Sequence, residues 1–332
     1  MIEGLHERLS DTIRAALPQT HSQPELDTFY ALMRDYPERG GKQLRGVFVL
    51  LSCLMHGGKL EDALSVAAAL ELFQNWVLVH DDIEDDSDER RGQPTLHKLA
   101  GMPVALNVGD ALHVYMWRTL FGAQVRREQV LNEFTEMILR TAEGQHLDLS
   151  WVQAGRFNIT EADYLRMVTL KTAHYTVASP LRLGALCADL TPAESYSEAG
   201  KRLGVAFQIR DDVLNLLPAS AQAGYGKEFA GDLYEGKRTL ILAHLFAEAS
   251  AAEKAHFKAI LSKPRQAKTE ADIMTLLNAI RAKGSLDYAQ AVAEANAKRG
   301  LALLDKATHV LPEQSAVREL SGLLETLAER RV

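Results

Sequence analysis

Residues 76–92 read Trp-Val-Leu-Val-His-Asp-Asp-Ile-Glu-Asp-Asp-Ser-Asp-Glu-Arg-Arg-Gly, an apolar helical run that ends in a dense row of acids. Asp81 and Asp85 are four positions apart, so on a helix they share one face, with Asp82 at its edge. Ionised carboxylates in apolar sequence are costly without a partner, and magnesium prefers oxygen ligands. The alternative, a solvated acidic helix end, is weakened by the apolar run of residues 76–79. We therefore expect a buried metal-binding face.

A second segment repeats this pattern. Residues 207–215 read Phe-Gln-Ile-Arg-Asp-Asp-Val-Leu-Asn and place Asp211 and Asp212 inside apolar helical sequence. Two such faces turned toward each other would form an oxygen-only cage for magnesium ions that are bridged to phosphate.

Basic side chains accompany both acidic segments. Arg90 and Arg91 follow the first one, and paired arginines suit bidentate phosphate contacts. The other basic candidates are Lys227 and Lys237 after the second segment, Lys42 and Arg45 near a helix start, and Lys171 beside Thr172 inside a helix. Any one of these is ordinarily a solvated side chain, but together with the acids they indicate a metal–diphosphate complex and two anionic substrates.

Composition excludes several classes of protein. The chain has 332 residues, a net charge of −7 and 47% apolar residues, which fits a well-packed globular protein and argues against nucleic acid as a partner. We find no secretory leader and no apolar run long enough to span a bilayer, so we expect no stable membrane insertion. Cys53 and Cys187 lie in apolar, helix-like sequence, which predicts two buried free thiols in a cytoplasmic protein.

The hydrophobic period is helical almost throughout, and no alternating strand pattern is convincing. We expect helices near residues 25–36, 42–56, 61–85, 103–122, 127–150, 161–188, 193–216, 238–249, 251–262, 269–283, 285–306 and 313–329. Without repeats or low-complexity linkers, this predicts one all-α domain over residues 1–332.

These motifs resemble those of the trans-isoprenyl diphosphate synthases, also called polyprenyl synthetases. His80 through Gly92 reproduces the family's first aspartate motif and its Arg-Arg-Gly, and residues 207–215 match the second except at Asn215. The remaining matches are Gly41, Lys42 and Arg45; Gly101 and Pro103; Asn107, Gly109 and Asp110; Lys171-Thr172; and Gly226-Lys227, Gly231-Asp232, Gly236-Lys237 and Thr239. They run in order from about residue 40 to residue 245.

The resemblance implies an isoprenoid synthase-like helical bundle around a deep central cavity, usually a homodimer. It also implies head-to-tail condensation of an allylic diphosphate (dimethylallyl, geranyl or farnesyl) with isopentenyl diphosphate, which releases diphosphate. The cofactor would be magnesium, three ions per active site, with manganese as a substitute.

The resemblance also assigns roles to residues. The metal ligands would be Asp81, Asp82, Asp85, Asp211, Asp212 and Asn215. The allylic diphosphate would be held by Arg90, Lys171, Lys227 and Lys237, and isopentenyl diphosphate by Lys42, Arg45, Gln74 and Arg91. Thr172, Gln208 and Tyr175 would aim oxygens at the allylic cation. The departure is Asn215, because a neutral amide is a poorer magnesium ligand than a carboxylate, although it can hydrogen-bond a metal-bound water.

Product length should depend on the helix that carries the first motif. Val77 and Trp76 lie four and five residues before Asp81, and Phe73 lies one turn deeper. One helical turn rises about 5.4 Å, close to one isoprene unit, so a bulky Trp76 should close the cavity early while the small Val77 leaves some room. In the family that the chain resembles, one aromatic residue at these two places, with no insertion in the motif, implies a twenty-carbon product, so we expect geranylgeranyl diphosphate, with farnesyl diphosphate as the alternative. The other interpretation is that Trp76 only packs between helices.

Two rival functions share this sequence pattern. A terpene cyclase also begins with an aspartate-rich helix, but it needs no second diphosphate site, so Lys42, Arg45 and the doubled arginine argue against it. A non-catalytic subunit of a prenyl synthase would lack aspartates that this chain keeps.

Overall fold

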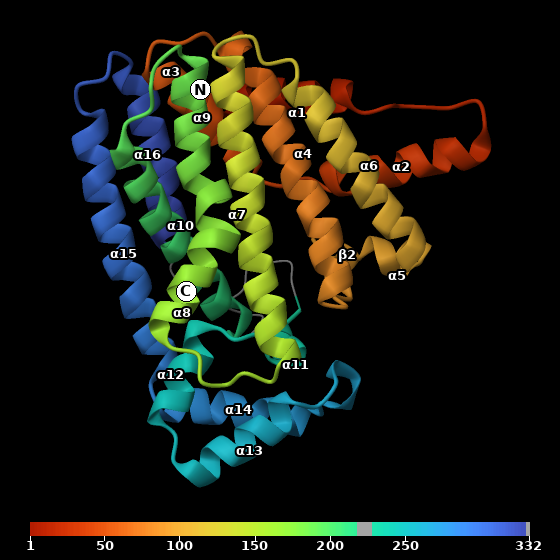
Figure 1. The fold of residues 1–332 in the computed structure, drawn as a ribbon, viewed down its shortest axis with the longest axis vertical. Helices are drawn as coiled ribbons and strands as arrows, with labels where there is room; N and C mark the ends of the chain where they lie inside the picture. Colours follow the sequence, from red (N-terminus) through yellow and green to blue (C-terminus); the bar gives the residue numbers. More distant parts are fainter. Residues whose placement is uncertain (218–227, 330–332) are drawn as a thin grey trace.

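The computed structural model describes residues 1–217 and 228–329, and long helices standing side by side form most of it (Figure 1). These long helices are α4 (Leu60–Glu84), α6 (Met102–Leu120), α7 (Arg127–Gln153), α10 (Glu194–Asn215) and α15 (Ser285–Thr308). The others are α1 (Ile2–Ala16), α2 (Pro24–Glu38), α3 (Leu44–Met55), α5 (Leu96–Ala100), α8 (Glu161–Val168), α9 (Ser179–Cys187), α11 (Gly231–Glu235), α12 (Leu240–Glu248), α13 (Ala251–Leu261), α14 (Glu270–Ala282) and α16 (Gln314–Glu329), with a π-helix η1 (Thr169–Ala178) and a 3₁₀ turn η3 (Arg265–Ala267).

The all-α prediction is confirmed. Each expected helix is present, with ends shifted by a few residues. Helices α1, α5 and α11 were not predicted. Nor was a hairpin of two short strands, β1 (Glu89–Arg90) and β2 (Gln93–Pro94), which turns the chain back directly after the first acidic motif.

The segment expected as one helix over residues 161–188 is divided into α8, the π-helix η1 and α9. Neighbouring helices reach η1 through glycines. A Cβ on Gly144 of α7 would lie 2.1 Å from the backbone nitrogen of Lys171, and one on Gly204 of α10 would lie 2.4 Å from the Cα of Ala173. The backbones therefore approach more closely than any larger residue would allow, and π-helical turns of this kind are frequent at functional sites.

Helix α4 is buried around most of its circumference and ends in the first acidic motif. By length and composition it could cross a membrane, which corrects the expectation that no apolar run is long enough, but 67% of its apolar window is buried inside the protein. A core helix passes the same test. Cys53 and Cys187 are both buried and free, as predicted.

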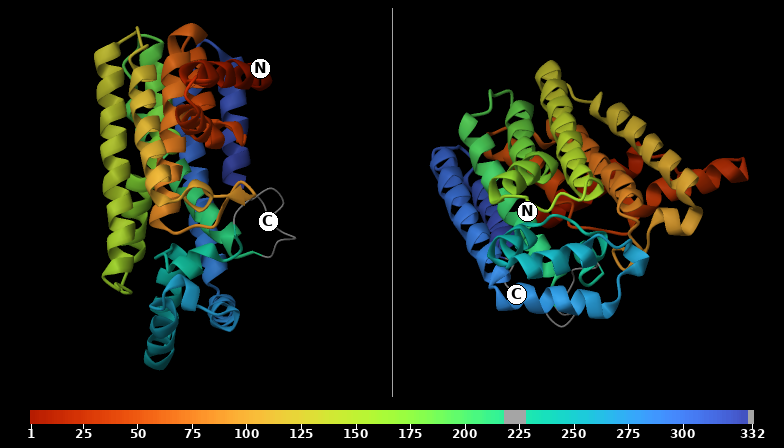
Figure 2. Two further views of the ribbon diagram at one scale, coloured as in Figure 1. Left: turned by 90° about the vertical axis from the view of Figure 1, so that its right-hand side faces the viewer. Right: turned by 60° about the horizontal axis from the view of Figure 1, so that its bottom comes forward.

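Two large clusters of buried apolar side chains lie along the bundle, and α10 contributes to both. Leu203 belongs to the first cluster, with α3, α4 and α6, whereas Ile209 belongs to the second, with α12 and α14. Helices α13 and α14 lie across one end of the long helices (Figure 2). The second acidic motif is therefore held between two packed cores.

Candidate active site

A cavity of about 360 Å³ lies where the ends of α4 and α10 face α7 and η1. The predicted side chains that line it are Lys42, Arg45, Gln74, Val77, Asp81, Arg90, Arg91, Lys171, Thr172, Tyr175, Gln208, Asp211, Asp212 and Lys237. Residues from distant parts of the chain thus meet at one place. Lys227 lies outside the described residues.

Asp81 lines the cavity and is surrounded by donors from three other elements. Gln145 Nε2 on α7 donates to Asp81 Oδ1 at 3.2 Å, Lys171 Nζ on η1 lies 3.5 Å from the same oxygen, and Arg90 Nη2 lies 3.7 Å from Oδ2. Lys171 Nζ is also 2.7 Å from Asp148 Oδ2. Burial opposes the charge on Lys171, but Asp148 and Asp81 outweigh it and raise its pKa, so the ammonium stays charged.

Asp82 is buried, with 1% of its surface exposed. Tyr36 on α2 donates its hydroxyl to Asp82 Oδ2 at 2.6 Å, and Arg90 Nε donates to Oδ1 at 3.0 Å and to Oδ2 at 3.2 Å, while Arg90 Nη2 also pairs with Oδ1. A carboxylate has about four lone-pair sites, so these contacts occupy them. Asp82 therefore anchors Arg90 in this structure, and its role as a metal ligand stays a prediction.

Asp85 follows the last residue of α4 and forms a link to the second motif's loop. Lys237 Nζ lies 2.7 Å from Asp85 Oδ2 and 2.9 Å from Glu235 Oε2. Burial raises the pKa of the Asp85 carboxyl to about 7. Burial opposes the charge on Lys237, but Asp85 and Glu235 outweigh it and raise its pKa, so the ammonium stays charged. Lys237, which is predicted to bind diphosphate, thus connects Asp85 of the first motif with Glu235 of α11.

The second motif also has one buried aspartate. Asp211 and Asp212 both line the cavity, and Asp212 is 6% exposed. Tyr164 on α8 donates its hydroxyl to Asp212 Oδ2 at 2.6 Å, and Gln208 Nε2 donates to Oδ1 at 2.8 Å. Burial raises the pKa of Asp212 to about 6. Thr172 donates to Gln208 Oε1 at 3.0 Å, so both ends of the Gln208 amide have fixed partners.

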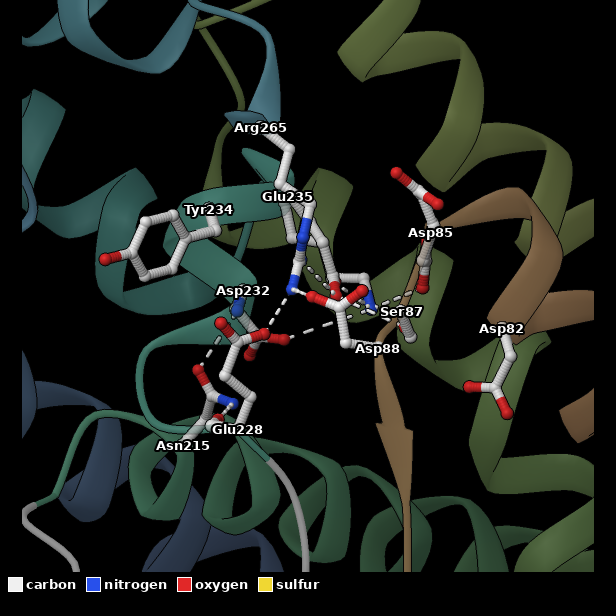
Figure 3. Close-up of polar contacts among 12 residues, drawn as sticks. Asp82, Asp85, Ser87, Asp88, Asn215, Glu228, Asp232, Tyr234, Glu235 and Arg265 are labelled. Atoms are coloured by element: carbon white, nitrogen blue, oxygen red, sulfur yellow. Dashed lines mark hydrogen bonds and ion pairs between the residues drawn. The ribbon is translucent and has the colours of Figure 1, made fainter. Parts of the chain in front are cut away.

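Asn215 binds the segment that leads into α11. The backbone N–H of Asp232 donates to Asn215 Oδ1 at 3.1 Å, and Asn215 Nδ2 donates to the carbonyl of Glu228 at 3.2 Å (Figure 3). Asp232, placed in this way, lines the same cavity as Asp81 and Asp211. The predicted contact of Asn215 with metal or its water is untested.

The residues predicted for isopentenyl diphosphate border the cavity on the α3 side. Arg45 Nη2 donates to Thr176 Oγ1 at 3.1 Å, and its Cζ lies 4.6 Å from the centre of the Tyr175 ring. Arg91 Nη1 donates to the Tyr36 carbonyl at 2.6 Å. Gly41 has φ +152°, and a Cβ there would lie 3.1 Å from Arg91 Nη2, so the glycine makes room for this arginine. Lys42 and Gln74 complete this group on the cavity wall.

Aromatic rings pack around Trp76, the residue predicted to form the floor of the cavity. Val77 lines the cavity, and Trp76 stacks on His113 of α6 with ring centres 4.3 Å apart. Phe73 is 1% exposed and meets Trp76 and Tyr175 edge-on, at 5.6 and 5.5 Å between ring centres. Trp76 therefore packs between α4 and α6, and its role as the floor of the cavity stays a prediction.

Several side chains at this site were not predicted from the sequence. They are Tyr36, Tyr164, Gln145, Asp148 and Arg238. Gln145 and Asp148 are three apart beside Gly144, a spacing that puts both on one helix face and could have been found. The tyrosines carry no such signal, because their helices are separate from both motifs.

The oxygen donors fit metal ions that are shared with a substrate. Within residues 1–217 and 228–329, no three His, Cys, Asp or Glu side chains converge closely enough to hold an ion by themselves. Magnesium commonly binds one or two carboxylates and completes its shell with water and phosphate oxygens. Asp81 and Asp211, one from each motif, face the same cavity and suit such bridging.

Comparison with known proteins supports the same chemistry. The model of the polyprenyl synthetase family matches residues 27–280. The chain is 32% identical over 332 residues to a short chain isoprenyl diphosphate synthase of Methanothermobacter thermautotrophicus, across 99% of this chain and 96% of that protein. It is 32% identical over 346 residues to a geranylfarnesyl diphosphate synthase of Natronomonas pharaonis, across 98% and 95%. A solved geranylgeranyl pyrophosphate synthase from Corynebacterium glutamicum, complexed with isoprenyl diphosphate and magnesium, matches with TM-score 0.86 and 27% identity, across 99% of this chain and 98% of that one.

Proposed function

The chain belongs to the polyprenyl synthetase family and is a prenyltransferase that elongates isoprenyl diphosphates, and from this premise we propose that it makes geranylgeranyl diphosphate. It would condense dimethylallyl, geranyl and farnesyl diphosphates in turn with isopentenyl diphosphate. The observation that carries the proposal is one cavity that both acidic motifs and two separate groups of cations line.

Divalent metal use is a property of the family, and we propose three magnesium ions with manganese as a substitute. Asp81 and Asp211 would hold them from the two motifs, with Asp85 joining once it separates from Lys237. Bound there, magnesium supplies charge neutralisation for the departing diphosphate. Arg90, Lys171 and Lys237 would take the remaining oxygens of that group.

The protein's own groups account for the rest of the reaction. The allylic C–O bond breaks, the double bond of isopentenyl diphosphate attacks the allylic carbon, and a C–C bond forms. A proton then leaves the new cation, and we assign it to the released diphosphate. Thr172 and Gln208, which are hydrogen-bonded to each other on the cavity wall, would turn oxygens toward the positive charge, while apolar side chains such as Leu78 and Phe207 would limit access of water.

Product length is the finer part of the proposal. Trp76 behind Val77 supports a floor near twenty carbons. The relatives include a geranylfarnesyl diphosphate synthase, so a product one unit longer is the nearest competitor among them, besides farnesyl diphosphate.

We also propose one domain, a cytoplasmic location and a homodimer. Large apolar side chains on α5 and α6 support the homodimer, because Leu99, Met102, Leu106 and Val114 are 46–63% exposed and a second copy would cover them. Light scattering on the purified chain tests the dimer, and a monomer at micromolar concentration would contradict it.

The decisive experiment is elongation by the purified chain with magnesium, labelled isopentenyl diphosphate and each allylic primer. We expect label in a C20 diphosphate, identified by chromatography after dephosphorylation. The Asp81→Asn variant is the matched control and should incorporate little label. Absence of incorporation with every primer would contradict the proposed synthase and favour the non-catalytic subunit.

A further inference from the structure

Arg265 reaches from η3, between α13 and α14, to acids that belong to both motif regions (Figure 3). Its Nη1 lies 3.3 Å from Glu235 Oε1, and its Nη2 lies 3.6 Å from Asp88 Oδ2 and pairs with Glu228 as well. The Arg265 side chain is 13% exposed and that of Glu235 is 10% exposed. One largely buried guanidinium therefore connects α11 with the loop after α4.

Glu235 is shared between two cations. Its Oε1 faces Arg265, and its Oε2 lies 2.9 Å from Lys237 Nζ. Lys237 lines the cavity, and its Nζ also lies 2.7 Å from Asp85 Oδ2 and 3.9 Å from Asp232 Oδ1. The chain of ion pairs thus runs without a break from Arg265, outside the cavity, to a lysine that faces the diphosphate position.

This sharing affects how Lys237 can act. A carboxylate that is divided between two cations attracts each less strongly than a carboxylate with one partner. Arginine keeps its charge at every relevant pH, so its hold on Glu235 is permanent. Without Arg265, the full charge of Glu235 would act on Lys237 and compete with diphosphate for its ammonium.

We infer that Arg265 is a positioning residue that holds the Glu235 carboxylate and so leaves Lys237 available to the diphosphate of the allylic substrate. The inference rests on the proposed role of Lys237. Nothing in it requires Arg265 to touch substrate.

Neighbouring contacts keep the segment in place without Arg265. Gln266 Nε2 donates to Asp86 Oδ2 at 2.9 Å, and Lys268 Nζ donates to the Tyr234 carbonyl at 2.5 Å. Replacing Arg265 therefore removes a charge next to Glu235 while two other contacts still fix η3 against both loops.

The test measures the affinity for inorganic diphosphate with magnesium by calorimetry, alongside steady-state kinetics with farnesyl diphosphate. Arg265→Gln should weaken diphosphate binding about tenfold, the scale of one charge-assisted hydrogen bond, and raise KM more than it lowers kcat. Arg265→Lys, which keeps the charge, should retain most of the affinity. Arg281→Gln removes an exposed arginine at the end of α14 and is the matched control, expected to equal the wild type.

The deciding variant is the double substitution Arg265→Gln with Glu235→Gln. Because the competing carboxylate is then neutral, affinity should return to within about threefold of the wild type. A purely structural role for Arg265 predicts no such recovery, so an unrescued double variant overturns the inference, as does an Arg265→Gln variant that binds like the wild type. If the wild type elongates prenyl chains but none of these changes alters affinity, only the inference fails. If the wild type binds no diphosphate, the role of Lys237 fails with it.

Discussion

Replacing Asp82 by asparagine should destabilise the fold, whereas replacing its neighbour Asp81 should not. Asp82 is 1% exposed and balances Arg90, whose side chain is 11% exposed. The variant leaves Arg90 with the more distant Asp81 carboxylate, 3.7 Å from its Nη2, and breaking a buried ion pair costs about 3–5 kcal/mol. The entropy of unfolding is about 2.1 cal/mol/K per residue, so the 332 residues of this chain give about 0.7 kcal/mol/K. The midpoint Tm of Asp82→Asn should therefore fall by about 4–7 °C.

Asp81→Asn provides the contrast at the adjacent position. Lys171 would keep Asp148 and Arg90 would keep Asp82, so no buried cation is left alone and Tm should stay within about 1 °C of the wild type. Its kcat/KM should nevertheless fall on the order of a hundredfold, because the lost carboxylate faces the metal position. Calorimetry without magnesium and initial rates with magnesium separate the two effects. Equal Tm losses in both variants, or an unchanged Tm for Asp82→Asn, would refute the assignment of Asp82 as an anchor.

Four further outcomes follow from the geometry. Trp76→Ala should lengthen the product by one isoprene unit, since one helical turn rises about 5.4 Å, and an unchanged chain length on chromatography would reject the floor assignment. Gly204→Ala forces a Cβ within 2.4 Å of the Ala173 Cα, so it should lower both Tm and activity, and a variant with wild-type Tm would show that α10 and η1 can separate freely. Burial lowers the pKa of His174 from 6.5 to about 4, so as the pH drops from 6.5 to 4 the unfolded state binds a proton before the folded state does, and stability falls. The Tm of His174→Gln should therefore fall less than that of the wild type over this range. Equal falls of Tm in the two proteins would contradict this. Chelation with EDTA should abolish turnover and leave the circular dichroism melting curve unchanged, whereas a shifted curve would indicate a structural metal.

The faces of the acidic helices could be predicted because they depend only on local spacing. Asp81 and Asp211 follow apolar helical sequence, and helical geometry alone puts each at the end of a buried helix. The helix α1 could also have been predicted, because the apolar residues Leu5, Leu9 and Ile13 recur every four positions, and all three are buried. Short elements were different, because five residues such as those of α11 are too few to show a period.

Tertiary partners could not be predicted from spacing. Tyr36 is 46 residues from Asp82, and Tyr164 is 48 residues from Asp212, so each contact exists only because of helix packing. The π-helix η1 was hidden for a related reason. Its segment mixes polar and apolar residues that are mostly buried, and the glycines that allow the close approach, Gly144 and Gly204, lie on other helices.

Each motif has two adjacent aspartates, and the geometry of a helix explains why they cannot do the same work. Successive residues point about 100° apart, so the second carboxylate is turned toward a neighbouring helix. Asp82 is not among the residues that line the cavity, and Asp212, at the cavity wall, accepts a hydrogen bond from Tyr164 of α8. There it needs donors, because a buried carboxylate without them is costly. At Asp82 a tyrosine and an arginine provide them, and at Asp212 a tyrosine and a glutamine do. The second aspartate thereby holds the end of the helix in the orientation that directs the first aspartate into the cavity. Neutralising the second aspartate should therefore lower the stability of the fold more than it lowers the affinity for metal.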